Sequence, residues 1–150
     1  MNNVRLELIN SCEKYVEQRV QRISMAMEQL KEDLENESKS SAGDKYETGR
    51  EMINIEWNKL SVQLKEYEKL DHILARLPKE RINEKIAVGS IVYTNAANYF
   101  ISIPAGEIEV DGEKFYAIGV QAPVAQKLVG LKEQDEFELN GQKIKIQKLI

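Results

Sequence analysis

The 150-residue sequence contains few of the side chains that build metal centres. Cys12 is the only cysteine, so an internal disulfide and a cysteine-based zinc or iron–sulfur site are excluded. His72 is the only histidine, which excludes multi-histidine metal sites. The formal net charge of −4 provides no overall positive field to attract nucleic acid, so any contact with nucleic acid is expected to be local or indirect.

Long apolar segments are also missing. No apolar run approaches the roughly 20 residues that span a membrane, and residues 1–10 have neither the basic start nor the apolar run of a secretory signal. These features predict a cytoplasmic protein. A chain of this length holds one compact domain, or one small domain and an extended element.

Residues 1–77 contain no proline, and their apolar side chains recur every three or four residues in two stripes. Such spacing is typical of helices that pair as a coiled coil. The first stripe consists of Ile9, Cys12, Val16, Val20, Ile23, Met27, Leu30 and Leu34, and the second of Ile53, Trp57, Leu60, Leu64, Tyr67, Leu70 and Leu74.

Residues 37–49 separate the stripes with three serines, two glycines and no aliphatic side chain larger than alanine, which predicts a turn between two antiparallel helices. The position halfway between Leu34 and Ile53 falls at Gly43 and Asp44, which are therefore the expected apex. Each arm of roughly 33 residues extends about 50 Å, longer than a small domain is wide, so the hairpin is expected to project into solvent.

The pattern changes after Pro78 to short β-rich segments with turn signals at Asp111-Gly112 and Asn140-Gly141. Pro123 and Gly130 bracket a short helix. The predicted fold class is α+β: a coiled-coil hairpin over residues 1–77, a linker over 78–85, and a small domain over 86–150 with an antiparallel sheet and one short helix. The expected strands cover residues 86–93, 99–103, 107–110, 114–118, 136–139 and 143–150.

Two carboxylates, Asp44 and Glu47, lie nearest the expected apex, within the tip segment 43–47. Three residues apart at a helix start, they lie on one face and can converge on one cation. Carboxylate oxygens suit magnesium, which typically takes only one or two protein carboxylates beside a phosphate-bearing partner. Because two exposed carboxylates bind the ion weakly, the site is expected to be incomplete until a partner supplies further ligands.

The same residues have a purely structural alternative. Asp-x-x-Glu at a helix start is a capping box, in which Asp44 accepts a backbone hydrogen bond and Glu47 reaches back. A box led by Ser41, one turn earlier, instead leaves Asp44 inside the helix and pointing outward. Of the other candidates, Cys12 and Trp57 are expected in the core, and His72 is expected to be a structural or surface residue.

The hairpin, its tip and the small domain together resemble the bacterial Gre transcript cleavage factors over the whole chain. The tip pattern of the family, Gly-Asp, two variable residues and Glu, matches residues 43–47. The stretch from Ala122 to Gly130 with its short helix, the acidic turn at Asp135-Glu136 and the last strand at 144–150 are also similar to the family. Residues 48–51 are Thr-Gly-Arg-Glu where the family usually has Asn-Ala-Glu-Tyr, and Ala122 and Gln134 replace a serine and a glycine, which indicates a divergent branch.

The resemblance implies that residues 86–150 are FKBP-like and dock at the rim of the secondary channel of RNA polymerase, while the hairpin passes inward. It implies that Asp44 and Glu47 help to hold a magnesium ion shared with the polymerase, so that the polymerase hydrolyses the 3′ end of backtracked RNA. Two-metal hydrolysis needs a second ion about 4 Å from the first, which agrees with a tip that is incomplete alone. The expected protein is a monomeric elongation factor without enzymatic activity of its own and without bound magnesium when free.

The sequence leaves three alternatives open. An inhibitor of the same architecture would enter the channel and block catalysis, although such relatives tend to carry a denser acidic tip. The C-terminal domain could be a prolyl isomerase, which needs a pocket of clustered aromatic side chains. A coiled-coil scaffold or chaperone would use the tip only as a turn.

Overall fold

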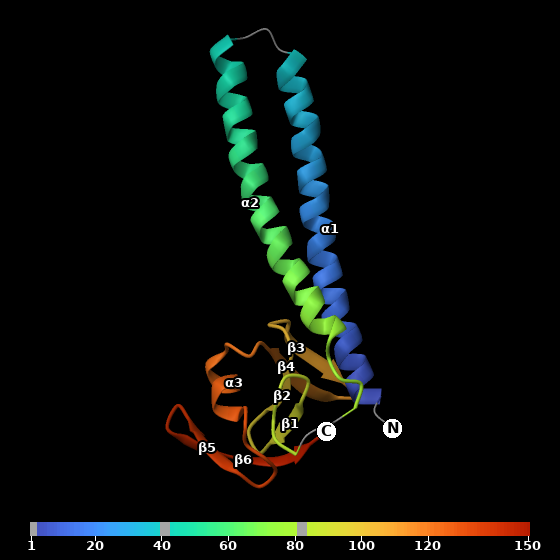
Figure 1. Ribbon diagram of the computed structural model, residues 1–150, viewed down its shortest axis with the longest axis vertical. Helices are drawn as coiled ribbons and strands as arrows, with labels where there is room; N and C mark the ends of the chain where they lie inside the picture. Colours follow the sequence, from blue (N-terminus) through green and yellow to red (C-terminus); the bar gives the residue numbers. More distant parts are fainter. Residues whose placement is uncertain (1–2, 40–42, 81–83) are drawn as a thin grey trace. The chain divides into compact units, whose positions relative to one another are not determined.

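The computed structural model describes residues 3–39, 43–80 and 84–150. Two long helices, α1 (Asn3–Lys39) and α2 (Gly43–Ala75), precede a six-stranded sheet with one short helix, which confirms the α+β class (Figure 1). The chain divides into two compact units. The sheet unit comprises Met1–Tyr15 and His72–Ile150, and the hairpin unit comprises Val16–Asp71.

In the hairpin unit, α1 and α2 pair in opposite directions along the two predicted stripes (Figure 1). Val16, Ile23 and Leu60 are buried in the seam. The expectation that Trp57 is a core residue is wrong, because its side chain is 37% exposed. Two helices enclose only one narrow seam, and an indole ring is too large to be covered from both sides there.

The sheet has the strand order β3-β4-β2-β1-β6-β5. Its described strand pairs are antiparallel apart from β2 and β4, which run parallel because β3 lies between them in the sequence and outside them in the sheet. The strands are β1 (Ile91–Thr94), β2 (Asn98–Ile101), β3 (Gly106–Val110), β4 (Glu113–Ile118), β5 (Glu136–Leu139) and β6 (Gln142–Leu149).

Local sequence signals explain where these elements begin and end. Asp111-Gly112 and Asn140-Gly141 all have positive φ angles, as two-residue hairpin turns require, and they join β3 to β4 and β5 to β6. Helix α3 (Pro123–Leu128) begins with proline at its start, as predicted. The first strand is shorter than expected, because Gly89 has a φ of 96° and the extended backbone begins only at Ile91.

The sheet buries both of its faces. On one face, Val92, Tyr99 and Ile101 pack with Leu128 of α3. On the other face, Ile91, Phe100 and Ala117 are neighbours in register and almost completely buried. The sheet is therefore a two-sided layer, and each face needs its own cover.

The first turns of α1 cover the second face. Leu8 and Cys12 are fully buried, and the Cys12 Sγ atom lies 3.8 Å from the Oγ atom of Ser102, just after β2. Arg5 donates a hydrogen bond to the backbone oxygen of Gly89. The sheet unit therefore includes residues far from 86–150 in the sequence. The predicted limits of the linker at 78 and 85 stay predictions, since residues 81–83 lie outside the described part.

Candidate functional site

The structure places the backbone of Asp44 and Glu47 in the first turn of α2, which begins at Gly43. Asp44 is thus the second residue of a helix. The side chains of both residues lie outside the described part of the structure, so an outward direction and a capping role both stay predictions. The chemistry of this donor set, two carboxylates with hard oxygen atoms three residues apart on one helix, fits a partial magnesium site.

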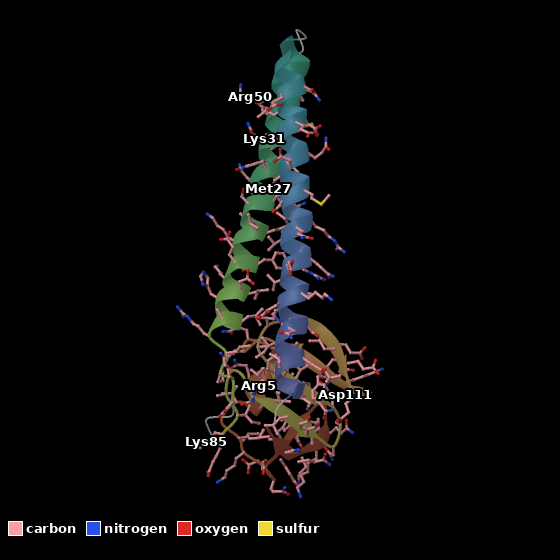
Figure 2. The ribbon with its side chains drawn as sticks, turned by 90° about the vertical axis from the view of Figure 1, so that its right-hand side faces the viewer. Arg5, Met27, Lys31, Arg50, Lys85 and Asp111 are labelled. Atoms are coloured by element: carbon pink, nitrogen blue, oxygen red, sulfur yellow. The ribbon has the colours of Figure 1, made fainter. Side chains whose placement is uncertain are left out.

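The helices come close together near this end. A Cβ atom at Gly49 would lie 2.8 Å from the Glu37 carboxylate, so Gly49 gives the half-buried Glu37 side chain room to lie across α2. Residue 43 is midway in the sequence between these two residues. Figure 2 shows Lys31 on α1 and Arg50 on α2 toward the same end of the pair. The end of the hairpin thus carries cations as well as the acidic pair.

Hollows that the sequence patterns did not indicate lie along the part of the seam that the structure describes. One, of about 240 Å³, is lined mainly by Leu30, Leu34, Ile53 and Trp57. The exposed face of Trp57 is therefore part of an apolar recess near the end of the hairpin. The sequence contained one indication of this recess, a large aromatic ring within the stripe of a two-helix hairpin. The spacing alone predicted that this ring lies in the core.

The second hollow, of about 300 Å³, has a different lining. Arg19 and Arg22 contribute from α1, and Gln63 and Tyr67 contribute from α2, around Ile23 and Leu60. Two of these polar side chains, Arg19 and Arg22, carry a positive charge, whereas Gln63 and Tyr67 are neutral. Residues three or four apart on one helix are neighbours in any register. Which residues of α1 and α2 face each other becomes known only from the register of the two helices.

Acidic clusters elsewhere do not form a second candidate. Within residues 3–39, 43–80 and 84–150, and with the tip side chains left aside, no group of three or more histidine, cysteine, aspartate or glutamate side chains could hold a metal ion. None of the helices described there is long and apolar enough to cross a membrane.

Three aromatic side chains of the sheet unit belong to its core. Phe100 and Phe115 are completely buried, and Tyr99 is 8% exposed. Tyr93 and Phe115 pack edge to face with ring centroids 5.5 Å apart. Phe100 and Phe115 fill space inside the unit, so they cannot line an open pocket for a proline ring. This arrangement does not favour the prolyl isomerase alternative.

Comparisons with known proteins add little to this geometry. No family model matches the chain, and no curated protein matches it. Among solved structures, it is similar to the prokaryotic transcription elongation factor GreA/GreB from Nitrosomonas europaea, with 22% identity over 61% of this chain and 89% of that chain. The TM-score is 0.30, and at this level the likeness establishes neither a family nor a function.

Proposed function

We propose that the protein is a transcription elongation factor that binds bacterial RNA polymerase, inserts its hairpin into the secondary channel and stimulates magnesium-dependent hydrolysis of backtracked RNA 3′ ends. The observation that carries the proposal is the position of Asp44 and Glu47 in the first turn of α2, at the end of a unit made only of two helices. The match of residues 43–47 to the Gre tip pattern supports it.

The dimensions of the hairpin unit suit a probe that enters a channel. About 24 residues of α1 and about 29 of α2 belong to this unit, which gives lengths of roughly 36 and 43 Å. Each helix with its side chains is about 10–12 Å across, so the pair is narrow. Met25, Ile55 and Val62 on the outer faces are at least 62% exposed, so no further layer of this chain covers them.

The tip residues would act by binding and orienting. Asp44 and Glu47 would hold a magnesium ion together with carboxylates of the polymerase, and when bound this ion supplies charge stabilisation and an activated water for phosphodiester hydrolysis. The carboxylate oxygens would fix the position of that water toward the RNA phosphate. The protein itself would not be an enzyme, because two carboxylates provide only part of the ligand set.

The test uses stalled, backtracked elongation complexes of the cognate polymerase. Wild-type protein is expected to release short 3′ RNA fragments, and Asp44→Asn and Glu47→Gln are each expected to slow release by at least about 10-fold, because each removes a charged ligand oxygen. Glu51→Gln is the matched control, since Glu51 is an exposed carboxylate one turn further along α2, and it should leave the rate nearly unchanged.

Other outcomes would replace the proposal. Binding without cleavage, with slower elongation, would identify an inhibitor that uses the same channel. Absence of any binding to the polymerase would remove both possibilities and favour a coiled-coil scaffold. A proline isomerisation assay on the full chain tests the enzyme alternative separately.

A further inference from the structure

Arg5 is a buried cation without a buried anion. Its side chain is 2% exposed, and it is the only charged residue among the buried residues of the described chain. One terminal nitrogen donates to the Gly89 oxygen, while Nε has no hydrogen-bond partner among the described residues. Burial lowers the pKa of the guanidinium, which shows the same unfavourable environment.

A buried charge with so few hydrogen-bond partners weakens the packing contact in which it lies. A buried charge is tolerated mainly when a counter-charge and further hydrogen bonds compensate for lost water, and a backbone oxygen compensates only in part. No described carboxylate forms an ion pair with Arg5. Replacing a buried charge by an apolar side chain of similar volume is often neutral or stabilising.

The contact in question is the one between α1 and the sheet. Arg5, Leu8 and Cys12 lie on one face of α1, and each is at most 2% exposed. Their partners include the Gly89 oxygen and the Ser102 hydroxyl. Gly89 itself has little freedom, because a Cβ atom there would lie 2.6 Å from the ring of Pro78. The oxygen that Arg5 contacts is therefore held by a tightly packed loop.

We propose that the first turns of α1 detach from the sheet in a minor state, and that the uncompensated charge of Arg5 sets how often they do so. Detachment exposes the sheet face of Ile91 and Phe100 while the rest of the unit stays folded. This inference does not depend on the proposed function in transcription.

Cys12 is a built-in probe for this state. It is the only thiol of the chain, it is fully buried, and it lies two turns from Arg5 on the same face. Burial raises the pKa of the thiol to about 11, so the attached form is protonated and inaccessible at pH 8. The experiment measures the rate at which 5,5′-dithiobis(2-nitrobenzoate) labels Cys12 in the full-length native protein.

Arg5→Met keeps the length of the side chain and removes the charge, so labelling should slow by about 10-fold. Arg5→Lys keeps a charge but loses the planar guanidinium, so labelling should become faster. Arg22→Met is the control, because Arg22 is exposed on the same helix, and it should change the rate by less than about 2-fold. Equal or faster labelling of Arg5→Met would overturn the proposal and make Arg5 a simple clamp.

A second measurement needs no variant. If labelling of the wild type proceeds through local detachment, its rate should depend less steeply on urea at low concentration than global unfolding does. A labelling rate with the full urea dependence of global unfolding would mean that Cys12 is reached only in the unfolded chain. That result would also overturn the proposal.

Discussion

The two units differ in how they bury their apolar side chains. In the sheet unit, both faces of the sheet are covered, and side chains such as Phe100, Phe115 and Leu128 have no exposed surface. In the hairpin unit, most stripe residues are only half-buried, and the outer faces carry exposed residues such as Ile55. A three-layer arrangement encloses a core, whereas two helices share only one seam. The hairpin unit therefore buries less apolar surface per residue than the sheet unit.

The largest effect should come from removing a central aromatic ring of the sheet unit. Phe100→Ala is expected to lower the free energy of unfolding by about 3–5 kcal/mol, because it leaves a cavity between the sheet and α1. The matched change in the hairpin unit, Leu30→Ala, should lower it by only about 1–2 kcal/mol, since Leu30 is half-buried and the seam can collapse. Urea unfolding followed by circular dichroism measures both, and equal losses would contradict the difference between the units.

The first turns of α1 should contribute to the stability of the sheet unit. Leu8→Ala is expected to lower the free energy of unfolding of the sheet unit by about 2–4 kcal/mol, because Leu8 is completely buried. Leu6→Ala, two residues earlier on the same helix, should change it by less than about 0.5 kcal/mol, since Leu6 is 59% exposed. Similar small effects at both positions would show that the sheet folds without the first turns of α1.

Alkaline pH should weaken the sheet unit through its buried thiol. Burial raises the pKa of Cys12 from its ordinary value of 9.0 to about 11, against the opposing effect of the Ser102 hydrogen bond. The folded state therefore keeps a proton that the unfolded state releases, so stability is complete below pH 9 and falls as the pH rises toward 11. The loss should reach about 3 kcal/mol at most.

Cys12→Ala is the comparison for this pH effect. It should flatten, although not abolish, the fall in the free energy of unfolding between pH 9 and 11. Part of the slope should remain, because burial also raises the pKa of Tyr93 and Tyr99. Urea titrations at several pH values check the slope, and an identical slope in the variant would show that the thiol does not contribute.

The smallest effect should come from the surface of the hairpin unit. Lys69→Ala removes a 3.1 Å ion pair with Glu66 in which both side chains are more than 60% exposed. Exposed pairs on one helix contribute little, so the free energy of unfolding should fall by less than about 0.5 kcal/mol. A loss above 1 kcal/mol in the same urea assay would mean that the hairpin unit depends on surface charge more than on its seam.

Elements with local causes were predictable from the sequence. The glycines at positions 112 and 141 permit the backbone angles of the two hairpin turns, and Pro123 starts α3. The two stripes predicted the paired helices for the same reason, because side chains three and four residues apart lie on one face of a helix. The expectation for Trp57 was wrong because periodicity indicates which face of a helix a residue lies on. It contains no information about how much surface the partner helix offers to cover that residue.

The tip could be located from the sequence only as far as the backbone. The patterns placed Asp44 and Glu47 at a helix start, and α2 begins there. Whether their side chains point outward stays a prediction, because helix capping and metal binding use the same residues at the same spacing. The hollow at Arg19 and Arg22 could not be predicted, since it depends on which residues of α2 lie opposite.

The sequence by itself determined the helices, the turns and the α+β class of this protein, because each follows from residues close together in the chain. Only the tertiary structure decided that Arg5, Leu8 and Cys12 belong to the sheet unit. Positions 5, 8 and 12 keep the spacing of three and four residues that leads on to Val16 in the coiled-coil stripe, so periodicity cannot distinguish a helix partner from a sheet partner. The distinction depends on Gly89 and Ser102, more than eighty residues away, whose surface exists only after the chain has folded.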